Sequence, residues 1–447
     1  MDTLHLKAPG SWLNDPNGFI YYKGKYHLFY QHFPFATRWG TMHWGHAVSE
    51  DLVHWEHLGV ALFPTKHFDA DGIFSGGAFE KDGKMLLYYT GVRYYTYEPE
   101  CRHVSLNDVY ECAQAMVESE DGETFDNYDG KKIIIPCIYD NDVANFNHTR
   151  DPKVWEEDGK YYMVLGSTYK KEIGRLIVAQ SDDAYKWEIK SVTTDKKFGR
   201  ILECPDMFEL EGERFLLASP MFIVPESEGY PAQSMIGKLD FDPETCEVSN
   251  LGEFSFIDHG RDAYATQSCV DEEGRRVMVI WIRMPEEIKY PSDKKAWNGM
   301  MTIPRVIENR EDGIHFSMHP NAKKYFDKEL TLDEIKTFDP RQEKPWMVKT
   351  TIKNGDEINL GGFKIWMEDN TIHTDRSEVL VHGTDRLRKT FEIPAYAEEY
   401  DLEIVMEPSV VEMYVDDGKH VLTNVFYGLK NELFGNIGHI YVSSEEA

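Results

Sequence analysis

One pattern of hydrophobic and polar positions recurs five times along the first two thirds of the chain. In each copy, an apolar-rich run of strand length leads into a turn centred on glycine, and a second apolar-rich run follows. β-Prone runs joined by Asp-Gly or Lys-Gly predict β-hairpins, because glycine readily adopts the positive φ of a tight turn. The five copies cover residues 19–30, 79–89, 154–164, 207–217 and 269–279.

The spacing of these hairpins predicts the fold of the N-terminal part. Successive turn glycines lie 59, 76, 53 and 62 residues apart, which leaves room for two further strands after each hairpin. A hairpin with two more strands makes a four-stranded blade, and five such blades predict a β-propeller. The alternative is an all-β sandwich with unrelated hairpins, but the fivefold recurrence of one unit favours the propeller.

The pattern changes towards the C-terminus. The repeats fade near residue 305, and short strand-like runs separated by polar turns follow, at 346–352, 362–366, 402–406, 410–415 and 440–442. Such runs predict a β-sandwich, and 331–335 predicts a short linker helix. We therefore expect an all-β chain, with a five-bladed β-propeller catalytic domain over 1–310, a linker over 311–335 and a C-terminal β-sandwich over 336–447.

The repeat also places one polar residue of each blade near the propeller axis. Counting back eight or nine residues from each turn glycine reaches Asp15, Ser75, Asp151, Glu203 and Thr266. Radial symmetry should gather these residues at one mouth of the central channel, and three of them are carboxylic acids. This expectation uses only the repeat spacing and the chemistry of the side chains.

Three converging acids suit the hydrolysis of a glycosidic bond. Most such enzymes need one ionised carboxylate, to attack or to activate water, and one protonated carboxyl group, to release the leaving oxygen. A like charge nearby raises one of the two pKa values, which creates this division of roles. Taken singly, each acid also has an ordinary explanation, namely a turn at Asp15, an ion pair of Asp151 with Arg150, and a solvated side chain at Glu203.

The segments around these acids resemble glycoside hydrolase family 32, the family of invertases, sucrose-6-phosphate hydrolases and fructanases. The matching segments are Trp12-Leu-Asn-Asp-Pro-Asn-Gly18, Met42–Trp55, Phe74-Ser-Gly76, Arg150-Asp-Pro152 and Glu203-Cys204. The resemblance covers essentially the whole chain, including a five-bladed propeller followed by a β-sandwich. Leu13, Gly77 and Leu202 depart from the commoner family pattern, which leaves the leaving-group subsite and the substrate preference open.

The resemblance implies a retaining β-fructofuranosidase that hydrolyses the terminal fructosyl bond of sucrose, sucrose 6-phosphate or short fructo-oligosaccharides. Asp15 would be the nucleophile and Glu203 the general acid/base, while Asp151 would bind ring hydroxyls together with Arg150. We expect Tyr264 and Gln267 near the pocket. The residues expected to bind substrate are Trp12, Asn14, Gln31, Trp39, Phe74, Ser75, Arg150 and Trp297.

Three alternatives remain at this point. A fructosyltransferase would use the same catalytic residues, and the ratio of free fructose to elongated products would reveal it. A catalytically inactive sugar-binding propeller would be expected to lack one of the three acids, and all three are present. A five-bladed arabinanase is disfavoured by the motif around Asp15.

Composition limits the kinds of partner and the cellular compartment that we expect for this chain. The chain of 447 residues carries 48 basic and 78 acidic residues, a net charge of −30, and such a surface repels nucleic acid and anionic lipid. The N-terminus lacks an apolar signal-peptide core, and the six cysteines form no Cys-x-x-Cys pair, so we expect a cytoplasmic protein with reduced thiols. A small fructoside is the expected partner, with no cofactor and no metal.

Overall fold

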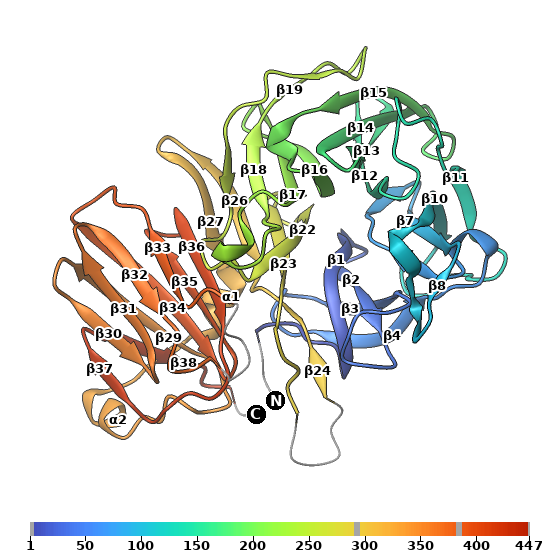
Figure 1. The fold of residues 1–447 in the computed structure, drawn as a ribbon. Coiled ribbons are helices and arrows are strands. Elements are labelled where there is room, and N and C mark those ends of the chain that lie inside the picture. The colour runs from blue at the N-terminus through green and yellow to red at the C-terminus, as the bar shows by residue number, and fades with distance from the viewer. Residues whose placement is uncertain (1–3, 290–295, 381–386, 446–447) are drawn as a thin grey trace.

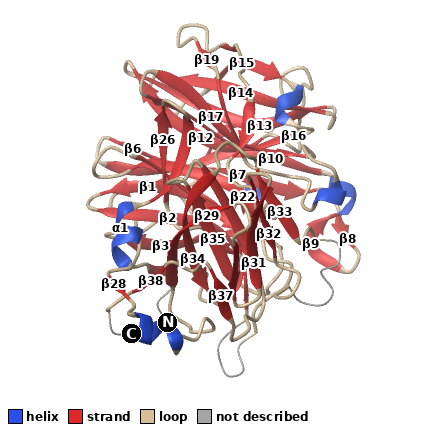
Figure 2. Cartoon of the chain, turned by 90° about the vertical axis from the view of Figure 1, so that its left-hand side faces the viewer, coloured by secondary structure: helices blue, strands red, loops and turns tan. Residues whose placement is uncertain are grey.

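Strands make up nearly all of the regular structure (Figure 2). The structure, a computed structural model, describes residues 4–289, 296–380 and 387–445. Short helices lie at the edges of the sheets and between them (Figure 2). Those of the described residues are α1 (Pro320–Tyr325) and α2 (Leu332–Lys336), with the 3-10 turns η1 (His67–Asp69), η2 (Leu106–Asp108), η3 (Lys196–Phe198) and η4 (Glu226–Glu228).

Five antiparallel sheets surround a common centre, and a two-sheet sandwich lies beside the fifth (Figure 1). The expected all-β fold, a five-bladed β-propeller followed by a C-terminal β-sandwich, is confirmed. Blade one contains β1 (Ser11–Tyr22), β2 (Lys25–Phe33), β3 (His43–Ser49) and β4 (Glu56–Leu62). Blade two contains β5 (Gly72–Phe74), β6 (Ala78–Lys81), β7 (Lys84–Tyr94), β10 (Tyr110–Ser119) and β11 (Lys132–Ile135).

The other three blades follow the same plan. Blade three contains β12 (Arg150–Glu157), β13 (Lys160–Tyr169), β14 (Ile173–Ser181) and β15 (Glu188–Thr194). Blade four contains β16 (Ile201–Leu210), β17 (Glu213–Met221), β18 (Met235–Lys238) and β21 (Phe254–Phe256). Blade five contains β22 (Ala263–Val270), β23 (Arg276–Ile282), β25 (Met300–Met301), β26 (Arg305–Arg310) and β27 (Gly313–Met318). Two small ribbons pair β8 (Tyr97–Glu98) with β9 (Cys101–Ser105), and β19 (Asp240–Phe241) with β20 (Val248–Ser249).

The predicted hairpins are the first two strands of each blade, except that blade two uses β6 and β7. Their turn glycines have φ between 76° and 84°. Four of the five glycines follow a residue that is also left-handed, namely Lys23, Asp82, Asp158 and Glu211. Two successive residues with positive φ form the type I′ turn, whose twist matches that of the flanking strands.

A second repeated feature, at the end of the third strand, confirms the relationship of blades one to three. In blade two, Ser119 Oγ accepts the amide of Gly122 (2.9 Å), and Asp121 Oδ1 accepts the amides of Glu123 and Thr124 (2.8 and 2.7 Å). The same bonds form around Ser49-Glu-Asp51 and around Ser181-Asp-Asp183. We refer to these three segments as the Ser-x-Asp turns.

The propeller closes through a short strand that returns from blade five to blade one. β24 (Trp297–Asn298) pairs in parallel with Ser11 and Trp12 of β1, and the Ser11 amide donates to the Ala296 carbonyl (2.7 Å). This closure fixes the start of β1, which carries Asp15, against the last blade.

The linker and sandwich differ in detail from their predicted bounds. β27 completes the fifth sheet within 311–335, the range expected to be a linker, and it is followed by α1, β28 (Lys328–Glu329) and α2. The predicted helix at 331–335 is α2, which Thr331 caps in a reciprocal capping box with Glu334. The two sandwich sheets contain, in spatial order, β28 (Lys328–Glu329), β38 (His439–Val442), β29 (Trp346–Lys353), β34 (Glu399–Glu407), β35 (Val410–Val415) and β36 (His420–Val425), then β33 (Thr390–Ile393), β32 (Thr371–Asp375), β31 (Phe363–Glu368), β30 (Glu357–Leu360) and β37 (Leu433–Gly435).

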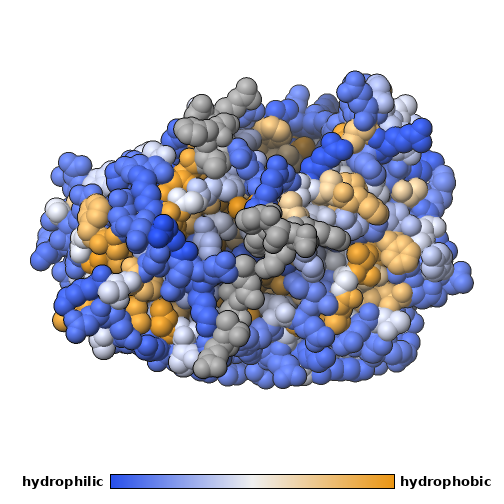
Figure 3. Space-filling view, turned by 90° about the horizontal axis from the view of Figure 1, so that it is seen from below, coloured by the Kyte–Doolittle hydropathy of each residue, from blue (hydrophilic) through white to orange (hydrophobic). Residues whose placement is uncertain are grey.

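One face of the molecule shows how hydrophilic and hydrophobic residues are distributed on the surface (Figure 3). Figure 3 shows one face on which hydrophilic side chains predominate and hydrophobic ones form separate small areas. Among the described residues, no helix has the length and apolar character needed to span a bilayer.

Candidate active site

A one-residue irregularity in the innermost strand of the blades positions the acids. β12, β16 and β22 each carry one extra residue relative to the neighbouring strand, a β-bulge, and β1 carries two such bulges, the first of them between Leu13 and Pro16. Asp151 and Cys204 lie in two of these bulges with left-handed φ of 64° and 47°. In blade two the strand is instead interrupted at Ser75, between β5 and β6. Bulges redirect the side chains that they contain.

The three acids do not occupy identical places in their bulges. Asp15 is the second residue between the paired positions of β1, Asp151 is the first in β12, and Glu203 is the last paired residue before the bulge of β16. They nevertheless line one cavity of about 410 Å³. The expected convergence of the acids is therefore present, while the matching of single positions predicted from the spacing is only approximate.

Asp15 lies among three hydrogen-bond donors. Ser75 Oγ donates to Oδ2 (2.6 Å), Asn14 Nδ2 donates to Oδ1 (3.0 Å), and Cys204 Sγ lies 3.7 Å from Oδ2. Burial raises the pKa of Asp15, and the nearby charge of Glu203 adds to this, while the bonds from Ser75 and Asn14 oppose it. Donors stabilise the ionised form, so this environment suits a buried carboxylate that must carry charge.

Asp151 has fewer donors. Its Oδ2 accepts the amide of Cys204 (2.8 Å), and its own amide donates to Thr90 Oγ1 (3.0 Å). Burial raises the pKa of Asp151 to about 7, and Glu203 and Asp15 reinforce the effect against the opposing charge of Arg150. The acidic neighbours therefore favour the protonated form of Asp151.

Both oxygens of Glu203 are engaged. Arg150 donates from Nε and Nη2 to Oε1 (3.1 and 2.6 Å). The hydroxyl of Tyr264 contacts Oε2, and it also lies 2.9 Å from the carbonyl oxygen of Ser219. A hydroxyl has one proton to donate and two acceptor lone pairs. When Tyr264 donates to Ser219, its oxygen can therefore accept a hydrogen bond from a protonated Oε2 of Glu203.

Comparison with known proteins identifies the family of the chain that contains these acids. Residues 5–320 match the family description "Glycosyl hydrolases family 32 N-terminal domain". The chain belongs to glycosyl hydrolase family 32. This result confirms the resemblance inferred from the motifs around the acids.

Relatives of this family 32 protein cover different shares of its length. It is 35% identical over 316 residues to the raffinose invertase of Escherichia coli, a match to 69% of this chain and 62% of that protein. It is 29% identical over 465 residues to the sucrose-6-phosphate hydrolase of Bacillus subtilis (strain 168), which covers 95% of this chain and 88% of that protein.

Solved structures of family 32 members share the fold. A GH32 beta-fructofuranosidase of Bombyx mori is 27% identical with a TM-score of 0.77, covering 98% of this chain and 92% of that chain. A sucrose-6-phosphate hydrolase from Lactobacillus gasseri is 23% identical with a TM-score of 0.82, and the match covers 99% of this chain and 93% of that chain. At that identity the second likeness concerns the fold alone.

Most of the subsite residues expected of a family 32 chain lie at the cavity. In addition to the three acids, the expected residues that line it are Asn14, Gln31, Trp39, Phe74, Ser75 and Arg150. Trp39 and Phe74 meet edge to face with ring centroids 5.8 Å apart, and Phe74 contacts Tyr110 in the same way. Gln31 donates to the Ile73 carbonyl (2.9 Å). The result is a pocket with one aromatic wall and one acidic wall, which suits a sugar.

Two expected tryptophans are placed differently. Trp12 does not line the cavity, but its Nε1 donates to Asn14 Oδ1 (2.6 Å), which leaves the amide nitrogen of Asn14 directed at Asp15. Trp297, expected at the substrate rim, is instead a core residue that is 4% exposed. It packs with Ile282 and Met300 of blade five, because β24 is the closing strand.

In blade five, the residue predicted by counting back from the turn glycine is wrong. Thr266 is buried and does not line the cavity, whereas Tyr264, two residues earlier, does. The bulge of β22 consists of Ala265, so the count from Gly274 reached the wrong side of the bulge. Gln267 is buried and bonds to the Gly76 carbonyl and to Lys153, so its role is to hold blades together.

Sequence reasoning missed the residues that complete the cavity wall. They are Tyr94, Val104, Ser105, Asp108, Tyr110 and Trp281. Five of them belong to the segment of blade two that contains the β8–β9 ribbon, an addition to one blade that the repeat does not predict. Trp281 is in β23, and its ring lies 5.8 Å from that of Trp12.

Proposed function

We propose that this family 32 protein is a retaining β-fructofuranosidase, with Asp15 as nucleophile, Glu203 as general acid/base and Asp151 as a ligand of the fructosyl ring. The observation that carries the proposal is that Asp15 and Glu203, in different hydrogen-bonding environments, line one pocket with a third acid. Proteins similar to this chain are named invertases, sucrose-6-phosphate hydrolases and beta-fructofuranosidases. A solved complex of a mutant of the Bombyx mori enzyme contains sucrose.

In the first step, Asp15 attacks the anomeric carbon of the fructosyl unit and the bond to the leaving sugar breaks. Glu203 protonates the leaving oxygen at the same time. Since Oε1 of Glu203 already accepts two N–H groups of Arg150, the proton to be delivered is on Oε2. Tyr264 keeps that proton in place before substrate binds.

In the second step, Glu203 takes a proton from water as that water attacks the fructosyl–Asp15 ester. The two displacements return the anomeric carbon to its original configuration. Asp151 has few donors around it, which leaves it able to accept hydroxyl groups of the sugar. Charge-assisted bonds of this kind are about twice as strong as neutral ones.

The substrate is a fructoside with a terminal β-D-fructofuranosyl unit, such as sucrose, sucrose 6-phosphate or a short fructo-oligosaccharide. The test compares kcat/KM on sucrose, its 6-phosphate and 1-kestose, with the first-formed fructose anomer followed by NMR. We expect β-D-fructofuranose to appear first. Initial release of the α-anomer would contradict the double displacement, and elongated products from concentrated sucrose would indicate a transferase.

A variant at Glu203 tests the assignment of the acid/base. We expect Glu203→Ala to lower turnover of sucrose by about 10²–10⁴-fold, the usual contribution of general acid–base catalysis. The loss should be smaller on 4-nitrophenyl β-D-fructofuranoside, because its leaving group needs little protonation. Near-normal turnover of sucrose by this variant would assign the acid to another residue.

A further inference from the structure

A line of polar contacts leads from the acid/base across two further blades. Arg150, which holds Glu203, also places Nη1 3.1 Å from His148 Nδ1. His148 Nε2 lies 3.0 Å from Asp108 Oδ2, which also accepts Lys171 Nζ (2.9 Å). Asp108 comes from blade two, His148, Arg150 and Lys171 from blade three, and Glu203 from blade four.

The chemistry of these groups fixes where the protons lie. A guanidinium group only donates hydrogen bonds, so His148 Nδ1 must accept the N–H of Arg150 and carries no proton. The proton of His148 is then on Nε2, directed at Asp108. Burial lowers the pKa of His148, and the charge of Arg150 opposes the raising effect of Asp108, which agrees with a neutral ring. Asp108 thus selects the tautomer that Arg150 requires.

The backbone around Asp108 forms a left-handed turn. Asn107 and Asp108 have φ of 58° and 54°, values that Asn and Asp adopt more readily than other residues with a side chain. Asn147 Nδ2 donates to the Asp108 carbonyl (2.7 Å), and the two contacts of the carboxylate complete the anchoring. Asp108 also lines the cavity.

The arrangement leaves Arg150 with a fixed orientation. Its Nη1 lies 3.1 Å from both the Tyr110 hydroxyl and His148, while Nε and Nη2 face Glu203. The side chain of Arg150 is only 8% exposed and that of His148 only 4%, so water does not readily replace a lost acceptor. Without His148, the guanidinium would keep its charge but lose one of the two contacts that orient it.

We propose that His148, with its tautomer set by Asp108, is a positioning residue that orients Arg150 and thereby presents Oε2 of Glu203 to the leaving oxygen. The inference rests on the proposed function of Glu203. Its consequence is specific: loss of His148 impairs protonation of the leaving group and has little effect on bond cleavage that needs no acid.

The experiment measures kcat/KM on sucrose and on 4-nitrophenyl β-D-fructofuranoside for His148→Phe, His148→Asn and the wild type. The ring of Phe removes the acceptor, whereas the Asn carbonyl oxygen can occupy the place of Nδ1 and accept from Arg150. We expect His148→Phe to lose about 10–100-fold on sucrose but under about threefold on the nitrophenyl fructoside, part of the usual general-acid contribution. His148→Asn should restore most of the loss.

Two further variants separate positioning from folding. Asp108→Gly suits the positive φ and deletes a carboxylate that is 54% exposed, so the core is unchanged; we expect a smaller loss, again confined to sucrose. His46→Phe is the matched control, because His46 is buried, bonds to His27 (3.1 Å) and does not line the cavity. It should lower activity on both substrates equally or not at all.

The outcomes are distinct. Equal losses on the two substrates for His148→Phe, or no advantage of Asn over Phe, would overturn the positioning role and leave the proposed function intact. A wild-type protein that releases no fructose from either substrate would instead refute the proposed function.

Discussion

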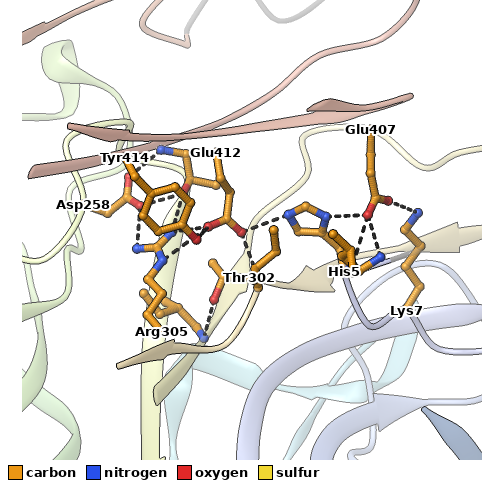
Figure 4. Close-up of polar contacts among 12 residues, drawn as sticks. His5, Lys7, Asp258, Thr302, Arg305, Glu407, Glu412 and Tyr414 are labelled. Atoms are coloured by element: carbon orange, nitrogen blue, oxygen red, sulfur yellow. Dashed lines mark hydrogen bonds and ion pairs between the residues drawn. The ribbon is translucent and has the colours of Figure 1, made fainter. Parts of the chain in front are cut away.

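Buried carboxylates occur in two regions of this protein, and the cations around them differ. Where the propeller meets the sandwich, Arg305 donates to Glu412 (2.8 Å) and Asp258 (3.0 Å), and Glu407 bonds to His5 (2.8 Å) (Figure 4). His5 Nε2 also lies 2.9 Å from Glu412. In the active site, by contrast, four acids line the cavity, namely Asp15, Asp108, Asp151 and Glu203, and Arg150 is the one cation among the described residues that line it.

Glu412 and Asp151 are both buried, so their neighbours account for the difference between their pKa values, whereas burial still raises the pKa of Asp258 despite its bond to Arg305. Although burial acts to raise it, Arg305 and His5 lower the pKa of Glu412 to about 2, whereas burial and like charges raise the pKa of Asp151 to about 7. Paired charges at the interface hold the two domains in one arrangement. In the pocket, Asp15, Asp151 and Glu203 have only Arg150 near them as a lining cation, so their mutual repulsion opposes folding, and we attribute their retention to chemistry.

The largest effect should come from removing one charge of the active site. We expect Asp15→Asn to lower turnover of sucrose by at least about 10⁴-fold if Asp15 is the nucleophile, as proposed, because its neighbours cannot replace it. The same change should raise the midpoint temperature of unfolding, since it relieves repulsion between buried acids. Activity assays and calorimetry measure the two effects together. Asp158→Asn, in an exposed hairpin turn, should alter neither quantity, and a destabilised Asp15→Asn would contradict the comparison.

At the interface, removing one cation should destabilise without affecting the chemistry. Arg305→Met leaves Glu412 and Asp258 buried without that partner, and breaking a buried pair in this way costs about 3–5 kcal/mol. Urea unfolding measures the loss, while kcat/KM of the folded variant should stay near the wild-type value. Arg310→Met is the control, because its ion pairs with Glu308 and Asp417 are half-exposed, and it should cost under about 1 kcal/mol.

The interface should also make stability depend on pH. Burial alone would lower the pKa of His5, but Glu407 and Glu412 outweigh it and raise the pKa to about 9. A raised pKa stabilises the folded state fully below the unfolded value of 6.5, and the contribution disappears as pH rises through 9. A shift of this size corresponds to roughly 3 kcal/mol. The difference in midpoint temperature between the wild type and His5→Gln should therefore shrink from pH 6 to pH 9.5. A constant difference would refute the pH-dependent contribution of His5.

The sequence predicted much of the fold and of the pocket because both are encoded locally. Hairpin turns need particular residues, such as Gly24 and Gly159, so the blades could be counted. The acids Asp15, Asp151 and Glu203 lie close in sequence to those turns, and their convergence followed. Thr266 was wrong because a bulge shifts the strand by one residue, and spacing alone does not reveal a bulge.

Other parts depend on contacts between distant segments. Trp297 is a core residue because β24 pairs with β1, a pairing that no local signal indicates. Asp108 and Tyr110 reach the cavity from an elaboration of one blade. The contact between His5 and Glu407 joins the two ends of the chain, so hydrophobic patterning could not predict it.

The smallest effect concerns acids that are neither paired nor buried. Backbone N–H groups, rather than cations, stabilise Asp121 in its Ser-x-Asp turn. These bonds lower its pKa against the opposing effect of burial, so its contribution to stability is present above pH 3.8 and disappears as pH falls. We expect Asp121→Ala to cost about 0.5–2 kcal/mol, as for loss of a helix cap, whose bonds are similar. Glu120→Ala, at an exposed neighbour paired with Lys84, should cost close to nothing. Equal costs in urea unfolding would mean that charge alone, and not the two amide bonds, accounts for the aspartate in each turn.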